Sequence, residues 1–156
     1  MPWRRSIEPF TRPLFFTFAR LKRGMTLGVR AVVTDETGRV LLVEHTYVPG
    51  WHLPGGGVER GETAETAIVR ELQEEAGVEP TSPPRLISIH SNETAFRGDH
   101  VLVYRVDAWR EVASSAQGEI LRRDFFAPDA LPHDVTAGTR RRIAEALGAD
   151  NATPHW

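Results

Sequence analysis

GGVERGETAETAIVRELQEEAGV, residues 56–78, joins a glycine-rich turn to a helix that carries a row of carboxylates. Apolar residues recur at helical spacing through residues 63–76, which predicts a helix there. Glu71, Glu74 and Glu75 are three and four positions apart, so a helix places their side chains on one face. Each like-charge pair at that spacing destabilises a helix by about 0.2–0.5 kcal/mol. A positively charged partner that offsets this repulsion is therefore expected.

The predicted helix has a second, apolar face. Ile68 and Leu72 can pack on a sheet, and the carboxylates are expected at the edge of that buried face. Gly77 is expected to end the helix, and Arg70 can hold a neighbouring carboxylate by a charge-assisted bond. Most acidic helices are simply solvated surface. The glycine-rich turn upstream favours a binding site, because glycine lets a backbone approach a ligand closely.

Clustered carboxylates are the ligands that Mg²⁺ prefers, with waters and substrate phosphates completing its coordination. A bound cation would also offset the repulsion among the three glutamates. The sequence therefore predicts a Mg²⁺ site, and a phosphate-containing small molecule as the ligand that shares it.

Length and composition fit one globular domain. The chain has 156 residues, of which 40% are apolar and 26% charged. It contains no cysteine, which excludes a disulfide framework, thiol catalysis and a cysteine zinc site. No apolar run approaches the roughly 18 residues of a membrane span, and no signal peptide is expected, so stable membrane insertion is not predicted and the cytoplasm is the default location.

Positive charge is concentrated at the start of the chain. Residues 1–30 hold seven Arg and Lys against one Glu, so with a net charge of −2 the remaining 126 residues carry −8. A basic arm on an acidic body does not indicate nucleic-acid binding by the whole surface. Residues 1–25 are interpreted as an N-terminal extension. Its apolar residues at helical spacing predict a segment packed on the domain or on a second subunit of a homodimer, and a membrane-surface anchor is the alternative.

The rest of the chain alternates between predicted strands and helices. Strands are expected at 26–35, 39–46, 85–91, 100–109 and 119–126, and a closing helix at 136–147. Residues 35–38 carry a hairpin-turn signal. Strands interleaved with helices favour an α/β layered fold.

The stretch from 56 to 78 resembles the Nudix box, G-x5-E-x7-R-E-U-x-E-E-x-G-U, in which U is a bulky aliphatic residue. Residues 51–55 and 129–132 also resemble the family's usual lead-in and late turn, and the resemblance covers about residues 26–147. Every fixed position of the box matches: Gly56, Glu62, Arg70, Glu71, Leu72, Glu74, Glu75, Gly77 and Val78.

The resemblance implies a fold and an activity. The expected fold is an α/β/α sandwich with a mixed β-sheet, in a Nudix domain at 26–150. Most members cleave a diphosphate linkage in a nucleoside diphosphate joined to another group, so a hydrolase acting on phosphorus-containing anhydrides is expected. The alternative is a Nudix-fold protein that binds nucleotide or phosphate without turnover.

Residues of this chain at matching positions of the box are expected to have the roles that those positions have in the family. Glu74 and Glu75 would bind Mg²⁺ or Mn²⁺, and Glu71 would be a further ligand or the base that deprotonates water. Arg70 would orient Glu71, and Glu62 would brace the box. Deprotonation of a metal-bound water by a carboxylate near neutral pH is consistent with these roles.

Residues outside the helix complete the expected site. The Gly55 carbonyl is an expected metal ligand, and Glu119 is the first candidate for a carboxylate from another loop, with Glu93 second. Glu119 could equally be a solvated strand-edge charge. Arg30 and His45, on the first two strands, are candidate contacts to phosphate or base, although strand positions are also compatible with burial. The substrate-binding candidates are therefore Arg30, His45 and Gly56.

Five other residues carry weaker expectations. Trp51 is expected to pack in the core rather than stack on a base, and Arg97 is expected to be an exposed loop residue. His52, His90 and His100 do not form a metal-ligand spacing, so they are expected to have a structural role or to face solvent.

Residues 92–98, NETAFRG, bear on the substrate. Members acting on ADP-ribose tend to carry a proline here, and those acting on dinucleoside polyphosphates a tyrosine nearby; this stretch has neither. The resemblance therefore leaves a modified nucleoside triphosphate or a nucleoside diphosphate sugar as the expected substrate.

Overall fold

The computed structural model describes residues 24–115 and 118–156. Its elements are β1 (Thr26–Val33), β2 (Val40–His45), β3 (Trp51–His52), α2 (Ala64–Glu71), the π-helical turn η1 (Leu72–Ala76), β4 (Val78–Pro80), β5 (Arg85–Ser91), β6 (Asp99–Val106), β7 (Trp109–Glu111), β8 (Ile120–Phe126) and α3 (Ala137–Ala146).

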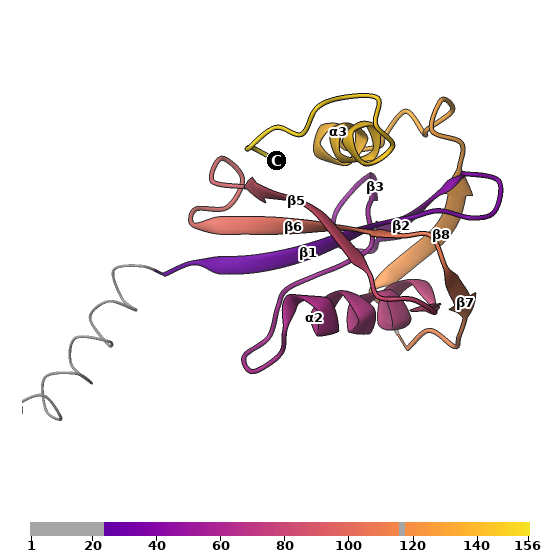
Figure 1. Ribbon diagram of the computed structural model, residues 1–156, viewed down its shortest axis with the longest axis horizontal. Helices are drawn as coiled ribbons and strands as arrows, with labels where there is room; N and C mark the ends of the chain where they lie inside the picture. Colours follow the sequence, from indigo (N-terminus) through magenta and orange to yellow (C-terminus); the bar gives the residue numbers. More distant parts are fainter. Residues whose placement is uncertain (1–23, 116–117) are drawn as a thin grey trace, which may run out of the picture.

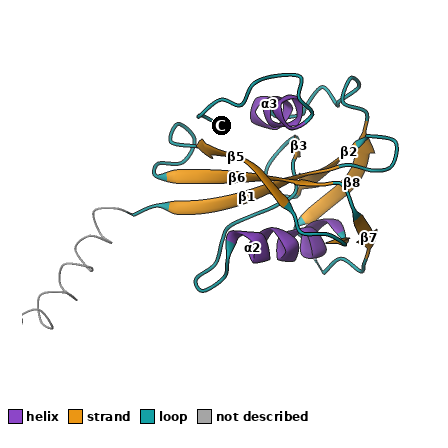
Figure 2. Ribbon diagram, in the orientation of Figure 1, coloured by secondary structure: helices purple, strands orange, loops and turns teal. Residues whose placement is uncertain are grey.

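The strands lie between the two helices, with α2 on one side and α3 on the other (Figures 1 and 2). One sheet has the order β1–β6–β5, in which β1 and β6 are parallel and β5 and β6 antiparallel. A second, antiparallel sheet has the order β3–β2–β8, and β4 pairs with β7. The predicted α/β/α sandwich with a mixed sheet is confirmed.

Alternation along β1 explains the layers. Successive strand residues point to opposite faces, so an apolar strand buried on both sides supplies two cores. Ala31 and Val33 belong to the core that contains Ile68 of α2, whereas Val32 belongs to the core that contains Ile143 of α3. The continuous apolar character of β1 therefore reflects helices on both faces.

The predicted turn after β1 forms, but the strands on either side of it separate. The Gly38 amide donates to the Asp35 carbonyl oxygen at 3.0 Å, which closes the turn. Beyond an isolated bridge between Thr34 and Val40, β1 pairs with β6 and β2 pairs with β8. The two strands therefore open into different sheets instead of forming one hairpin ladder.

The helix of the box is α-helical only as far as Glu71. Residues 72–76 form a π-helical turn, and Gly77 ends it in the left-handed conformation with φ 59°. The prediction for Gly77 is confirmed, and the prediction of one uniform α-helix over 63–76 is wrong in its second half. Because a π turn holds more residues than an α turn, it changes the direction of the side chains that follow. Glu75 lies in this turn and is only 8% exposed.

The shortest strands were not predicted from the sequence. The strand expected over 100–109 ends at Val106, and residues 109–111 form the separate strand β7 against β4. The strands β3 and β4 have two and three residues, which is too short for an alternating pattern to be recognised.

Thr63 begins α2 with a side-chain cap, since its hydroxyl oxygen accepts from the Thr66 amide at 3.1 Å. We expect Thr63→Ala to lower the free energy of unfolding by about 1 kcal/mol, because the amide loses its acceptor. Urea unfolding monitored by circular dichroism would measure this. Thr63→Ser retains the hydroxyl and should remain within a few tenths of a kcal/mol of the wild type; equal losses in both variants would contradict a capping role.

A buried polar cluster fixes the segment 149–156 against α3 and β5. The Arg142 guanidinium donates to Glu145 Oε1 at 2.8 Å and to the His155 carbonyl at 2.8 Å. His90 is fully buried, with Nδ1 2.7 Å from Arg142 NH1. Its Nε2 lies 3.8 Å from Glu145 Oε2. The expectation that His90 has a structural role agrees with this position.

This cluster should make the fold sensitive to mild acid. Burial, with the charge of Arg142 second, lowers the pKa of His90 below its usual 6.5, while Thr153 and Glu145 oppose the shift. The unfolded chain therefore binds a proton at His90 more readily than the folded chain, so stability is retained above pH 6.5 and is lost as the pH falls below it. Urea unfolding between pH 8 and 5 should show a shallower pH dependence for His90→Gln than for the wild type; identical slopes would contradict this.

The basic extension at 1–25 lies almost entirely outside the described residues. The predictions of a packed segment, a homodimer contact or a membrane-surface anchor fall on that part and stay predictions. In the part of the chain that the structure describes, no helix is long and apolar enough to cross a membrane.

Candidate active site

Arg70 joins the loop before α2 to the carboxylates of the helix. Its guanidinium donates to Glu62 Oε2 at 3.1 Å, to Glu71 Oε1 at 2.9 Å and to the Gly57 carbonyl at 3.1 Å. Glu74 Oε2 lies 3.4 Å from the same group. The pKa of Arg70 is raised, chiefly by the hydrogen bonds that its guanidinium donates to Glu62. Arg70 thus contacts both Glu62 and Glu71, and the expected bracing by Glu62 and the orienting of Glu71 by Arg70 stay predictions.

Glu75 is a buried carboxylate. Its Oε2 accepts from the Gly55 amide at 2.9 Å, and its Oε1 lies 3.8 Å from His45 Nδ1. Burial raises the pKa of Glu75 to about 7, although the Gly55 hydrogen bond and the charge of Arg30 oppose the shift. Burial, with Arg30 second, lowers the pKa of His45 to about 4. His45 is therefore neutral near pH 7 and does not neutralise the charge of Glu75.

The glycine turn packs directly on β1. The Gly56 carbonyl accepts from the Val29 amide at 2.9 Å, and the Gly55 carbonyl accepts from the Arg30 guanidinium. Gly55 has φ 139°, and a Cβ there would lie 2.1 Å from the Val29 carbonyl oxygen. Only glycine fits at this position. The Gly55 carbonyl, an expected metal ligand, is thus bonded to Arg30 in this structure.

Gly56 lies against the carboxylate of Glu71. A Cβ built on Gly56 would be 2.4 Å from Glu71 Oε1, so the missing side chain is what makes room for the glutamate. Burial raises the pKa of Glu71, and the hydrogen bond from Arg70 opposes it. Glu71 contacts Gly56, and Glu75 contacts Gly55. The turn and the helix therefore hold two half-buried or buried carboxylates side by side.

Arg30 of β1 and His45 of β2, the two candidate substrate contacts, both lie beside the glycine turn and the carboxylates. Arg30 bonds Gly55 and lines an adjoining cavity, and its charge acts on the pKa values of Glu71 and Glu75. His45 is buried, and its Nδ1 has no hydrogen-bond partner among the described residues.

Glu119 lies immediately before β8 and is exposed. Its backbone is fixed, since its carbonyl accepts from the Thr46 amide at 2.9 Å. Its charge contributes to raising the pKa values of Glu75 and Tyr47, which places it within electrostatic range of the site. Glu93, the second candidate, instead accepts from the Gly98 amide at 2.7 Å within its own turn.

The donor set fits a hard divalent cation chemically, but it is not preassembled. Among residues 24–115 and 118–156, no three acidic or histidine side chains are arranged to hold a metal ion. Instead Glu71 is held by Arg70 and Glu75 by the Gly55 amide. Glu74, with 46% of its side chain exposed, has room to turn toward them. A cation would stabilise the two carboxylates whose pKa values burial raises.

Comparison with known proteins decides the family. The family model of the NUDIX domain matches residues 24–147. The chain belongs to the Nudix family. It is a hydrolase of the class that acts on phosphorus-containing anhydrides. The match covers the box and every strand from β1 to β8, so the resemblance found in the sequence is confirmed.

Individual Nudix relatives agree with this assignment. A MutT-like protein of Streptomyces ambofaciens is 32% identical over 83% of this chain and 80% of its own length. A Bacillus subtilis protein, provisionally named an 8-oxo-dGTP diphosphatase, is 30% identical over 76% of this chain and 77% of its own. The crystal structure of a MutT NUDIX hydrolase from Burkholderia pseudomallei superposes with a TM-score of 0.65 at 28% identity, covering 76% of this chain and 95% of that one.

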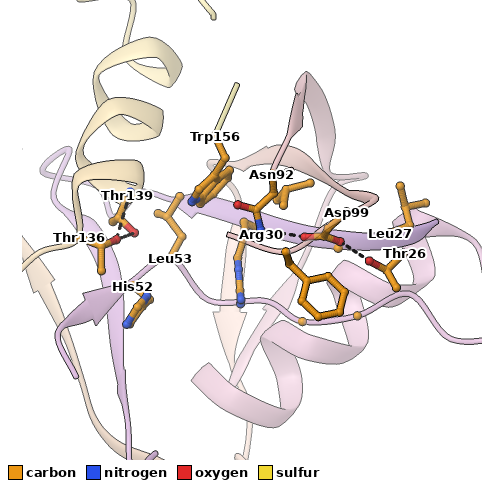
Figure 3. Close-up of a pocket in the computed structure, with 15 residues that line it drawn as sticks. Thr26, Leu27, Arg30, His52, Leu53, Asn92, Asp99, Thr136, Thr139 and Trp156 are labelled. Carbon is orange, nitrogen blue, oxygen red and sulfur yellow. Dashed lines mark hydrogen bonds between the residues drawn. The ribbon is translucent and has the colours of Figure 1, made fainter. Parts of the chain in front are cut away.

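The structure also brings residues to the site that sequence reasoning missed. A cavity of about 320 Å³ begins at Gly56 and Arg30 and extends between β6 and α3 (Figure 3). Asn92, Asp99 and Trp156 contribute to its lining. Asn92 belongs to the stretch 92–98 that was considered for its bearing on the substrate, but it was not singled out there. Asp99 begins β6 and Trp156 lies far from the box in sequence, and no local pattern marks either of them.

Two minor expectations are confirmed by position. Trp51 is 6% exposed and packs edge-on against Phe126, with ring centroids 4.9 Å apart. The side chain of Arg97 is 96% exposed.

Proposed function

We propose that this Nudix protein hydrolyses the diphosphate linkage of a modified nucleoside triphosphate with Mg²⁺, releasing a nucleoside monophosphate and pyrophosphate. The observation that carries the proposal is the pair of carboxylates, Glu71 and Glu75, held against the turn at Gly55 and Gly56. The name of the relative from Bacillus subtilis, which contains an oxidised nucleoside triphosphate, supports a modified triphosphate over a nucleoside diphosphate sugar.

In the proposed site the glutamates hold the cation and Arg30 receives phosphate. Glu74 and Glu75 would bind Mg²⁺ or Mn²⁺, and Glu71 would be a third ligand or would take the proton from the attacking water. A divalent cation supplies charge neutralisation and lowers the pKa of a bound water. Arg30 points from β1 to the same turn, so its guanidinium can donate to a phosphate oxygen once it leaves the Gly55 carbonyl.

Arg70 keeps these groups in position. It is bonded to Glu62, Glu71 and Gly57, so it fixes the carboxylate of Glu71 relative to the turn. Hydrolysis would then consist of attack of water on one of the two phosphorus atoms of the α–β linkage and cleavage of the P–O bond that joins them. The leaving group is pyrophosphate or the nucleoside monophosphate, according to which phosphorus is attacked, and the proton of the water passes to Glu71 or to solvent. Glu119, which is exposed beside β8, would add a carboxylate on the side of the site facing Tyr47.

A substrate panel tests the proposal. The protein is incubated with Mg²⁺ and oxidised or unmodified nucleoside triphosphates, nucleoside diphosphate sugars, ADP-ribose or dinucleotides, and the products are identified by chromatography and ³¹P NMR. We expect a modified triphosphate to be consumed fastest, with pyrophosphate released and no turnover in EDTA. Ligand binding without metal-dependent product from any substrate would contradict the proposal and favour a silent binding protein.

A further inference from the structure

The acidic helix ends in a π-helical turn that carries two of the glutamates. The turn η1 (Leu72–Ala76) continues directly from α2, and the Gly77 amide donates to the Leu72 carbonyl five residues back. Such turns are rare inside helices and occur frequently at functional sites. This one contains Glu74 and Glu75, both proposed to bind the cation. The contacts that hold the turn therefore also set the direction of these two carboxylates.

The carbonyl groups at the end of this helix are bonded by residues that follow β7. The last carbonyls of a helix have no partner within it, so neighbouring groups must supply the donors. The Ser114 hydroxyl donates to the Glu74 carbonyl at 2.5 Å. The Val112 amide donates to the Gly77 carbonyl at 2.9 Å. Strand β7 lies beside the end of the helix (Figure 1), because it pairs with β4, which begins immediately after Gly77.

Arg123 reaches the same turn from β8. Its guanidinium donates to the Ala76 carbonyl through NH1 and to Glu111 Oε1 at 3.0 Å through NH2. The carbonyls at the C-terminal end of a helix carry partial negative charge, which disfavours carboxylates nearby and favours a cation. Arg123 thus supplies a positive charge at the end of the helix that carries Glu74 and Glu75.

The bonds from Ser114 and Arg123 lie on either side of Glu75. One fixes the backbone of Glu74, the residue before it, and the other fixes the backbone of Ala76, the residue after it. Glu75 is buried, whereas the side chain of Glu74 is half-exposed. A backbone shift in this turn would move both carboxylates, because they belong to consecutive residues.

We propose that Ser114 and Arg123 are positioning residues, which hold the π-helical turn so that the carboxylates of Glu74 and Glu75 converge on the cation. The inference rests on the proposed function, because it takes these two glutamates as metal ligands. It assigns a role to β8 and to the residues after β7, neither of which belongs to the box.

Amide hydrogen exchange in the metal-free protein, measured by NMR, tests the turn directly. The Gly77 amide, bonded to the Leu72 carbonyl, reports on the π-helical turn. The Ala67 amide, bonded to the Thr63 carbonyl at 2.9 Å, reports on the first turn of α2. We expect Ser114→Ala to speed exchange of the Gly77 amide about fivefold to tenfold and that of the Ala67 amide less than about twofold, because one local hydrogen bond is lost.

Binding of Mn²⁺ without substrate, followed by electron paramagnetic resonance, tests the cation site apart from turnover. We expect Ser114→Ala and Arg123→Ala each to weaken Mn²⁺ binding about tenfold, as loss of a group that orients a metal ligand does. Ser114→Thr and Arg123→Lys retain a donor and should recover most of the affinity. Glu111→Gln is the matched control, because it removes the ion pair of Arg123 and leaves its bond to the Ala76 carbonyl.

Turnover assays give a third readout. The two alanine variants should need about tenfold more Mg²⁺ for half-maximal rate, whereas the KM for the nucleotide should change less than about threefold. Thermal unfolding verifies that each variant is folded at the assay temperature.

The outcomes separate the positioning role from the proposed hydrolysis. Metal-dependent turnover with unchanged Mn²⁺ affinity in Ser114→Ala and Arg123→Ala would overturn the positioning role and leave the function intact. Weaker Mn²⁺ binding in these variants with recovery in Ser114→Thr, but no turnover of any substrate by the wild type, would support the positioning role and overturn the hydrolysis. Equally faster exchange of the Gly77 and Ala67 amides would indicate general destabilisation and overturn the positioning role.

Discussion

Glu75→Gln is expected to lower kcat by two orders of magnitude or more at saturating Mg²⁺. Glutamine preserves the size of the side chain and can still accept from the Gly55 amide, which lies 2.9 Å from Glu75 Oε2. What it removes is the negative charge that would bind the cation, and metal-assisted hydrolysis depends on that charge. Stopped or continuous assays of pyrophosphate release over a range of Mg²⁺ concentrations would measure the loss.

The same substitution should not destabilise the fold. Burial raises the pKa of Glu75 to about 7, so an uncharged side chain suits the metal-free site at least as well as the carboxylate. Glu74→Gln should lose activity similarly, whereas Glu65→Gln, on an exposed position of α2, should retain it. Rates close to wild type for Glu74→Gln and Glu75→Gln would exclude these residues as metal ligands.

Gly56→Ala is expected to reduce kcat/KM about 100-fold with little loss of folded protein. The added methyl group would lie 2.4 Å from Glu71 Oε1 and 2.6 Å from its Cδ, so the carboxylate must move. Its three nearest atoms all belong to the flexible end of Glu71, so the backbone can stay in place. Displacement of a catalytic group by about 1 Å can cost about 100-fold in rate.

Gly57→Ala is the matched control for this experiment. A Cβ at Gly57 meets no atom within 4 Å, and its φ is not in the left-handed region. We expect Gly57→Ala to retain activity within a few-fold, and both variants to unfold at temperatures close to the wild type. If both variants were equally impaired, the cause would be stiffening of the turn rather than displacement of Glu71.

The box could be interpreted from sequence because its constraints are local. The turn, the helix and the glycine that ends it follow from residues within one short stretch, and so do the contacts of Arg70 with Glu62 and Glu71. The runs of β-branched and apolar residues in β1 and β2 likewise indicated strands. These features depend on spacing along the chain, which a sequence displays directly.

Tertiary contacts set the features that could not be predicted. The burial of Glu75 depends on the π turn and on the approach of the Gly55 amide from a different part of the chain. The separation of β1 from β2 depends on β6 and β8, which follow much later in sequence. Trp156 enters the cavity wall because Gly138 leaves space for it, and neither residue reveals that alone.

We infer that Glu71, Glu74 and Glu75 hold divalent cations against the diphosphate of a nucleotide. Crystals grown with Mn²⁺ and a non-hydrolysable nucleoside triphosphate provide the most direct measurement, through anomalous scattering from the metal. We expect anomalous peaks between the three carboxylates and the phosphate oxygens, with Glu74 turned toward Glu75. Nucleotide bound with these carboxylates still on Arg70 and the Gly55 amide, and no metal between them, would contradict it.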